Sequence, residues 1–347
     1  MCWKGSVIAK NIIRGTPEHG YACLPTFPHM ELLNSGSSYF IMVNRMDGLF
    51  VYYFLAFEVC IRGYAHMIKV IAVDGTHLYG NYGGVLLSAI GQDTENHIFP
   101  ITFCVIDKEN DASWTFFFQK LKSIVEDEPD LCVISDRHIS IANSFSHVYS
   151  CAHHGLCMRH LAENLCSKCL EVAHVFENVF GFEKWSRAHF SGNRYNVITT
   201  NIVESLKSIL MDERVYPMSY IFNSIDRKFG EKFRERHAFV DSKENIFVTY
   251  AKSILRDNKS ASDLLYVSNP NRVLDQYTVF SNGVTSKVNL LKMSYSCRKF
   301  DLVKIPCEHA MEALRAKYGD GEGYLTPYTT TLCQFIKMKV TSPHTRK

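Results

Sequence analysis

The apolar residues from position 69 onward form short runs that are separated by turn-forming residues. KVIAVDGTHL (69–78), GGVLLSAIGQD (83–93) and HIFPITFCVID (97–107) each have the composition of a strand, and the connection GNYGG favours a turn. We therefore predict three consecutive antiparallel strands. Pro100 has no N–H to donate to a ladder, so we expect the third strand at a sheet edge, or Pro100 as its first paired residue.

A helix and a fourth strand follow. DASWTFFFQKLKSIVEDEPD (111–130) predicts a helix that begins at the N-cap Asp111 and ends at Pro129, and LCVISD (131–136) predicts a buried strand. A connection that contains a helix of this length allows the fourth strand to return parallel to the first. Three antiparallel strands, a helix and a strand parallel to the first are the plan of an RNase H-like α/β domain, with a mixed sheet flanked by helices.

The N-terminal region contains the most apolar run of the chain. LFVYYFLAFEVCI (49–61) places aromatic and aliphatic residues at helical spacing, so we predict a core helix there. The run is too short, and at Glu58 too charged, to span a bilayer. Residues 1–66 are therefore expected to form an α-rich region, and no membrane partner is expected.

The segments after the fourth strand are predicted to be helical first and irregular later. Residues 139–150 and most of 185–240 have helical patterns, and HHGLCMRHLAENL (153–165) predicts a short strand that leads into a helix. After position 241 we expect polar loops, a hairpin within 277–297 and a helix at about 309–317.

Composition narrows the class of protein. With 46% hydrophobic and 21% charged residues, the 347-residue chain can form a folded core, and a formal charge of +3 permits a nucleic-acid partner without arguing for one. The chain has twelve cysteines, and its N-terminus has no apolar signal segment. We therefore expect reduced thiols, in the core or on a metal, rather than a secreted disulfide scaffold.

Two aspartates end predicted strands that should be neighbours. Asp74 ends VIAVD and Asp136 ends VISD, and in the predicted order these strands are parallel, so both carboxylates reach one sheet edge. Close carboxylates repel unless a divalent cation lies between them, as in two-metal phosphoryl chemistry. Asp74 can instead initiate a turn with Gly75, and Asp136 with Arg137 and His138 can be a solvated strand end.

A third carboxylate candidate lies on a predicted helix. In TTNIVESLKSILMDE (199–213), Glu204 flanks an apolar stripe in the first full turn, from which a side chain can point across the sheet. It can equally be an ordinary first-turn acid that the helix dipole favours.

The sequence motifs together resemble a known family. VIAVDGTHL, LLSAIGQD, FCVIDKENDASWTFFFQKL, CVISDRH, HHGLCMRHLAENL and TTNIVESLKSIL occur in this order and look like the Mutator-like element (MULE) transposases of plants, over roughly residues 10–330. The resemblance implies that Asp74, Asp136 and Glu204 are the metal-binding DDE catalytic residues of an enzyme that cleaves and joins DNA. It also implies Mg²⁺ or Mn²⁺ as cofactor, double-stranded DNA (transposon ends and target) as partner, a homo-oligomer on that DNA and a nuclear location.

Two groups of cysteine and histidine extend the resemblance. Cys157 and His160 have a C-x2-H spacing that the family also shows, which leaves a structural, a DNA-adjacent and a metal-binding role open. Cys297, Cys307 and His309 resemble the SWIM zinc finger, C-x-C-x(n)-C-x-H, which commonly follows the catalytic domain in this family and binds Zn²⁺.

The SWIM-type module departs from this pattern at one ligand. Tyr295 stands where the first cysteine is expected, so zinc would need water, Tyr295 or a remote thiol such as Cys333 as its fourth ligand. A metal-free, packed hairpin and helix is the alternative. The expected parts of the chain are the α-rich region 1–66, the RNase H-like domain 67–240, a connecting region 241–289, the degenerate SWIM-type finger 290–318 and a tail 319–347.

Other departures leave two functions open. The helical insertion near 166–184 is shorter than in the family, and we expect the chain to lack the N-terminal DNA-binding zinc finger of full-length relatives. The chain is then either an active DDE transposase, or a domesticated or decayed copy that binds DNA as a regulator without cutting it. Basic residues after Glu204 either form a solvated helix face or contact phosphate; they are Arg227, Lys228, Lys232, Arg234 and Arg236.

Overall fold

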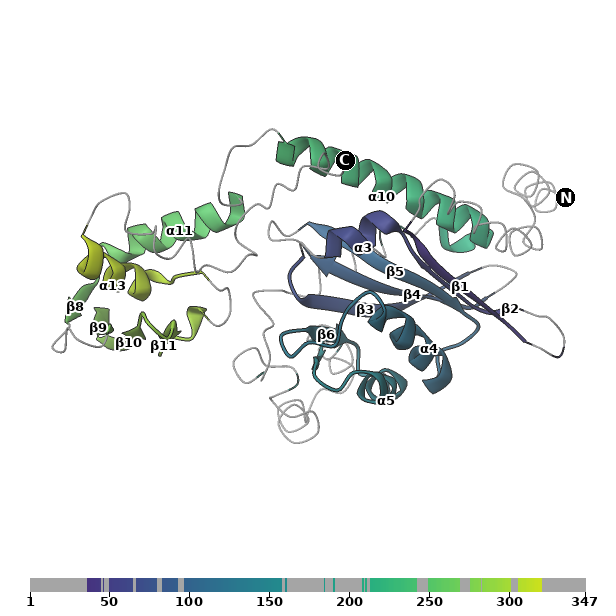
Figure 1. Ribbon diagram of the computed structural model, residues 1–347, viewed down its shortest axis with the longest axis horizontal. Coiled ribbons are helices and arrows are strands. Elements are labelled where there is room, and N and C mark those ends of the chain that lie inside the picture. The colour runs from purple at the N-terminus through teal and green to yellow at the C-terminus, as the bar shows by residue number, and fades with distance from the viewer. Residues whose placement is uncertain are drawn as a thin grey trace, which may run out of the picture. The chain divides into compact units, whose positions relative to one another are not determined.

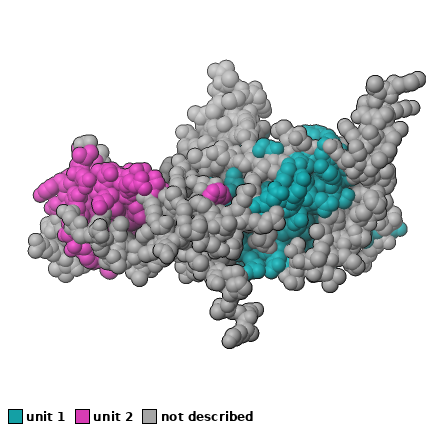
Figure 2. Space-filling view, turned by 90° about the horizontal axis from the view of Figure 1, so that it is seen from above, with its two compact units in different colours: residues 1–93, 98–192, 198–239 teal, residues 94–97, 193–197, 240–347 magenta. Residues whose placement is uncertain are grey.

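The chain divides into two compact units, which are coloured separately in Figure 2. One consists of Met1–Asp93, Ile98–Gly192 and Ile198–Phe239, and the other of Thr94–His97, Asn193–Val197 and Val240–Lys347. The computed structural model describes residues 36–44, 46, 50–64, 67–79, 83–92, 97–157, 160, 184, 190, 208, 210, 213–241, 249–268, 275–281, 283–300 and 305–319. Glu204, Cys333 and nearly all of the predicted insertion near 166–184 lie outside the described residues.

In the described part of the first unit, seven strands form a mixed sheet in the order β1-β2-β5-β4-β3-β6-β7 (Figure 1). The strands are β1 (Ser38–Val43), β2 (Phe50–Ala56), β3 (Val70–His77), β4 (Val85–Gln92), β5 (Ile98–Ile106), β6 (Cys132–Ser135) and β7 (His153–Leu156). Strands β3, β4 and β5 pair antiparallel, as predicted, and β6 pairs parallel with β3. This mixed α/β arrangement is consistent with an RNase H-like domain.

Helices cover both faces of this sheet, as Figure 1 shows. The helical elements of the unit are α3 (Glu58–Tyr64), α4 (Asp111–Lys122), α5 (Ile139–Val148), the 3-10 turn η2 (Glu213–Val215) and α10 (Met218–Asp241). On one face, the fully buried Trp114 of α4 packs edge-on against Phe117 at 5.6 Å between ring centroids. On the other, Phe222 of α10 packs against Tyr53 of β2 at 5.1 Å. Aromatic side chains therefore contribute to the core on both faces of the sheet.

The apolar run 49–61 is a strand followed by a helix, so the predicted core helix is wrong. Phe50–Ala56 forms β2 and Glu58–Tyr64 forms α3. The neighbouring residues Tyr53 and Phe54 are both completely buried. A strand that is buried on both faces is apolar at every position, so it lacks the alternation that distinguishes a strand from a buried helix.

Pro100 lies in an interior strand, which corrects the prediction that its strand is a sheet edge. β5 pairs with β4 on one side and with β2 on the other. The pairing with β2 covers only Phe103–Ile106, and the β4 register shifts between Ala89 and Ile90, beside Pro100. The missing N–H is tolerated because neither neighbouring ladder is regular at that position.

The first long helix begins and ends earlier than predicted. Its N-cap is Asn110 rather than Asp111, because the Asn110 side chain accepts a hydrogen bond from the Ser113 N–H at 3.0 Å. The Ser113 hydroxyl in turn accepts from the Asn110 N–H at 3.0 Å, which completes a capping box. The helix ends at Lys122, well before Pro129.

Among the residues described for the second unit, four strands form a sheet in the order β11-β10-β9-β8. Its elements are α11 (Thr249–Ser262), β8 (Tyr266–Ser268), β9 (Gln276–Ser281), β10 (Val284–Asn289), β11 (Ser294–Tyr295) and α13 (Glu308–Tyr318). The predicted hairpin is confirmed as β9 and β10, and the predicted C-terminal helix as α13. Helix α11 was expected to be a polar loop, and this prediction is wrong. Among the described residues, no helix is both long and apolar enough to cross a bilayer.

Candidate functional site

Asp74 and Asp136 lie at the ends of two neighbouring segments of the sheet. β3 and β6 are parallel and pair from Val70–Cys132 to Ala72–Ile134, and this register, continued by two residues, makes Asp74 level with Asp136. Asp74 belongs to β3 and is only 5% exposed, whereas Asp136 is the first residue after β6. The predicted adjacency of the two strands is confirmed. We call the place where Asp74 and Asp136 lie the carboxylate edge.

The turn after β6 fixes the backbone around Asp136. The Asp136 carboxylate accepts a hydrogen bond from the His138 N–H at 2.9 Å. His138 is itself the N-cap of α5, and its Nδ1 accepts from the Ser140 N–H at 3.3 Å. His138 therefore caps a helix, while Asp136 is held at the start of a short turn.

Glu109 also reaches the carboxylate edge, although the sequence analysis did not select it. It lies in the loop between β5 and α4. Its Oε1 is so close to Gly75, the residue after Asp74, that a Cβ added at Gly75 would lie 2.1 Å from it. Burial raises the pKa of Glu109, and the Asp136 carboxylate raises it further. Glu109 therefore lies against Gly75, near enough to Asp136 for the two carboxylates to repel each other.

His154 packs behind this edge as a neutral imidazole. Its ring stacks on Phe145 at 5.0 Å between centroids, and its Nε2 is 2.9 Å from the Ser135 hydroxyl. Burial lowers the pKa of His154 to about 4, and Lys184 lowers it further, against the opposing effect of Asp136.

The other candidates of the first unit are less fully described. Glu204 lies outside the described residues, so its role as third acid remains a prediction. Cys157 is buried at the end of the β7 segment, and its N–H donates to the Ser135 carbonyl at 2.8 Å. The role of Cys157 and His160 also remains a prediction.

The segment of the chain that contains the carboxylate edge is similar to a known protein family. Residues 70–164 match the family model of the MULE transposase domain. This is a DDE transposase family. The match begins at the first residue of β3 and includes Asp74, Glu109 and Asp136. No curated protein matches the chain.

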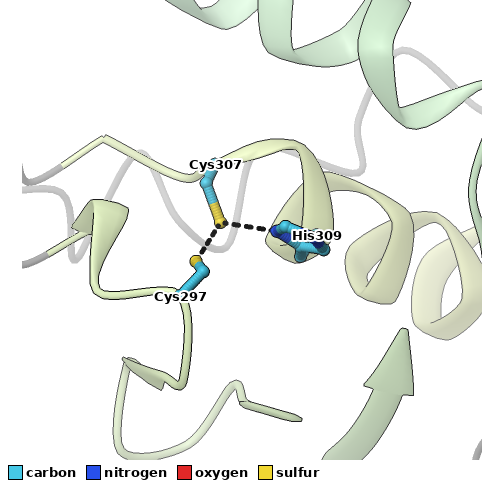
Figure 3. Close-up of side chains that lie close together, drawn as sticks. All are labelled: Cys297, Cys307 and His309. Carbon is cyan, nitrogen blue, oxygen red and sulfur yellow. Dashed lines mark hydrogen bonds between the residues drawn. The ribbon is translucent and has the colours of Figure 1, made fainter. Parts of the chain in front are cut away.

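A second candidate site lies in the second unit, beyond the residues that match the MULE transposase domain. Cys297, Cys307 and His309 bring their ligand atoms within 4.8 Å of one another (Figure 3). The two sulfurs are 3.5 Å apart, and the Cys307 sulfur is 3.9 Å from the His309 Nδ1. Tetrahedral zinc with bonds of about 2.3 Å to sulfur holds two sulfurs roughly 3.8 Å apart. The three side chains therefore have a spacing that a metal ion can bridge.

The charges around this cluster favour a thiolate. The Cys307 thiol donates to the Cys297 sulfur, and this hydrogen bond holds the pKa of Cys297 below its usual range. The same shared proton raises the pKa of Cys307. The ammonium of Lys299 forms an ion pair with Glu308 and adds a positive charge near both sulfurs. A thiolate that shares a proton with a neighbouring thiol, beside a cation, can bind a soft metal once that proton is released.

Tyr295, at the position where the first cysteine was expected, is part of the core. It is 4% exposed, pairs with Val288 across β10 and β11, and packs edge-on against Phe300 at 5.1 Å. Among the described residues, the group of potential metal ligands here consists of two cysteines and one histidine.

One of the basic residues after Glu204 has a structural partner. Lys228 of α10 forms an ion pair with Glu213, which also accepts a hydrogen bond from the Ser224 hydroxyl at 3.0 Å. Glu213 is buried. Lys228 therefore neutralises a buried carboxylate that joins η2 to α10, and the phosphate-contact prediction is left to the remaining basic residues.

Proposed function

We propose that the chain is a DNA transposase of the Mutator-like family, which cleaves DNA and transfers strands with a divalent metal and the acids Asp74, Asp136 and Glu204. One observation carries the proposal: the β3 and β6 register puts Asp74 level with Asp136 inside the segment that matches the MULE transposase domain. Glu204 is included in the proposed triad because of its sequence motif alone.

The donor set fits a hard divalent cation. The carboxylate edge offers oxygen ligands, which Mg²⁺ and Mn²⁺ prefer, and Gly75 leaves space for the carboxylate of Glu109 beside it. A bound metal would lower the pKa of an attacking water or 3′-hydroxyl and stabilise the leaving oxygen. Asp74 and Asp136 would hold the ion at the strand ends, and the hydrogen bond from the His138 N–H would orient the Asp136 carboxylate.

The proposal extends to partners and to the second unit. Double-stranded DNA at transposon ends and target is the substrate, and the chain acts as a homo-oligomer in the nucleus. We further propose that Cys297, Cys307 and His309 bind Zn²⁺ as a degenerate SWIM-type finger, with the fourth position taken by a ligand from outside the trio.

The test of this function is nicking of supercoiled plasmid DNA by the full chain with Mg²⁺ or Mn²⁺, a substrate that requires no knowledge of the terminal repeats. We expect metal-dependent nicking by the wild type and loss of at least about a thousandfold in Asp136→Asn, because the substitution removes a metal-binding charge but little volume. Binding of duplex DNA should be unchanged. If both proteins bind DNA and neither nicks it, the chain is a DNA-binding regulator instead.

A further inference from the structure

Cys297 and Cys307 lie on two segments of the second unit that hydrogen bonds hold in place. Cys297 belongs to the turn after β11, in which the Arg298 N–H donates to the Tyr295 carbonyl at 3.0 Å. Cys307 is the N-cap residue of α13, and its carbonyl accepts from the Met311 N–H at 2.9 Å. The backbone is therefore fixed close to both cysteines.

The sulfurs of these two cysteines are in direct contact. They are 3.5 Å apart, and Figure 3 shows the two side chains pointing toward each other. The Cys307 side chain makes no capping hydrogen bond to α13, and its sulfur is directed at Cys297 instead. A disulfide bond is about 2.05 Å long, so side-chain rotation and a small movement of the turn at Cys297 are enough to form one.

Solvent reaches the two sulfurs unequally. Cys297 is half-buried, whereas Cys307 is only 1% exposed. An oxidant from solution therefore meets the Cys297 sulfur first, and the Cys307 sulfur already touches it from the protein side. An accessible cysteine next to a second, resolving cysteine is the arrangement that favours reversible oxidation.

The tyrosine at position 295 weakens the protection that a metal would give this pair. A complete zinc site holds its thiolates on the ion with four ligands, and a site with fewer protein ligands releases the ion more readily. Among the described residues, the ligand group here is Cys297, Cys307 and His309, while Tyr295 packs into the core. Loss of the metal leaves two sulfurs in contact with each other.

We propose that Cys297 and Cys307 form a site of reversible oxidation, at which a peroxide links them by an intramolecular disulfide. This inference goes beyond the proposed function, and only its competition with Zn²⁺ rests on the proposed zinc site. The disulfide uses both sulfurs, so the oxidised pair cannot supply thiolates to a metal. Oxidation at this site therefore controls whether the second unit can hold zinc.

The reaction takes two steps and consumes one peroxide. The Cys297 sulfur attacks one oxygen of hydrogen peroxide, the O–O bond breaks, and the products are a sulfenic acid at Cys297 and one water, which carries the thiol proton. The Cys307 sulfur then attacks the Cys297 sulfur. The S–S bond forms, the S–O bond breaks, and the hydroxyl group leaves as a second water with the Cys307 proton. The two cysteines together lose two electrons, and the peroxide gains them.

Peptide mapping of the full chain tests the inference, because trypsin separates the two cysteines. Cleavage after lysine and arginine gives the peptides 293–298 and 305–315, each of which contains one cysteine. The protein is reduced, freed of metal by a chelator, exposed to hydrogen peroxide and blocked with N-ethylmaleimide before digestion. We expect one linked species, lighter by two hydrogens than the two peptides together, to replace most of the separate peptides. The chain should still migrate as a monomer without reductant, and dithiothreitol should restore both peptides.

Two variants distinguish a specific pair from general oxidation. In Cys307→Ser the second step is blocked, so the sulfenic acid at Cys297 should persist and dimedone should label it at least about fivefold more than in the wild type. Cys151→Ser, which removes an exposed cysteine of the first unit, should leave the linked species unchanged. The inference is wrong if both peptides are recovered with N-ethylmaleimide on their cysteines while Cys151 is oxidised. Equal linkage of Cys297 to several other cysteines would also overturn it.

Added Zn²⁺ separates this inference from the proposed zinc site. One equivalent should slow the linkage roughly tenfold in the wild type but not in His309→Ala, which keeps both sulfurs and loses the third ligand. Linkage at the same rate with and without Zn²⁺ counts against the zinc site, while the disulfide stands. Tight Zn²⁺ binding by a trio that forms no disulfide when metal-free overturns the oxidation site and leaves the zinc site intact.

Discussion

Asp74 on β3 is level with Asp136 beyond β6, because the two strands run parallel with Ala72 paired to Ile134. The crossover that makes them parallel includes helix α4, whose Trp114 is completely buried. The position of the two carboxylates therefore depends on the sheet core, whereas their chemistry depends on what binds between them.

Replacing Asp127 with Asn should lower the free energy of unfolding by about 2–3 kcal/mol. Burial opposes ionisation of Asp127, but hydrogen bonds from the N–H groups of Ser150, Ala152 and Cys151, with Lys122 at 3.1 Å, hold its pKa well below the usual range. An amide in place of the carboxylate would point an NH₂ group at some of these donors. Urea unfolding at pH 7 measures the difference.

The same aspartate should make the fold acid-sensitive. Because its folded pKa lies below the unfolded value of 3.8, the stability it contributes is complete above about pH 4 and is lost as the pH falls further. Asp127→Asn should show a smaller loss of stability between pH 4 and pH 2 than the wild type. The exposed neighbour Glu126, changed to Gln, is the matched control, and an equally acid-sensitive Asp127→Asn would contradict the assignment.

His154 should make stability depend on pH in a second range, which is less acidic than the range of Asp127. Its folded pKa of about 4 lies below the ordinary value of 6.5, so the unfolded state binds more protons between these pH values and stability falls as the pH drops through them. His154→Phe keeps the ring stacked on Phe145 and should remove roughly 3 kcal/mol of this pH dependence. His147→Phe, at an exposed position, should leave the profile unchanged.

The zinc content of the purified protein should be below one equivalent. Cys297, Cys307 and His309 supply only three ligands, and a site with fewer protein ligands releases its metal more readily. Tyr295→Cys should restore one tightly held equivalent, at some cost in stability because it removes a buried ring. Chelators should barely change the melting of the first unit.

Elemental analysis decides the zinc prediction. Cys307→Ser should abolish zinc binding, and Cys151→Ser, which changes an exposed cysteine of the first unit, is its control. A full, tight equivalent in the wild type that persists in Cys307→Ser would show that other residues bind the metal.

Strands could be located from the sequence most reliably where turn-forming residues separate one apolar run from the next. The four strands from β3 to β6 were located correctly because Gly and Asp residues separate their apolar runs, although the edge position of β5 and the ends of α4 were not. The run that became β2 and α3 was misread because Tyr53 and Phe54 are both buried, which leaves no polar face to mark the period. Helix α11 was missed because its sequence is largely polar, and only a few residues such as Leu255 pack into the core of the second unit.

Glu109 could not have been selected from the sequence. It belongs to no periodic pattern, and its place at the carboxylate edge depends on a loop geometry that Asn110 and Ser113 set. The only sequence signals were an acid between a strand and a helix and a glycine directly after Asp74. Neither signal shows by itself that Glu109 and Gly75 are in contact.

The most direct test of the proposed metal site is a crystal structure of the full chain soaked with Mn²⁺, with anomalous diffraction to locate the ion. If Asp74 and Asp136 bind the metal, a manganese peak should lie at the carboxylate edge, within coordination distance of both side chains. A peak elsewhere, with none between these two side chains at saturating Mn²⁺, would contradict it.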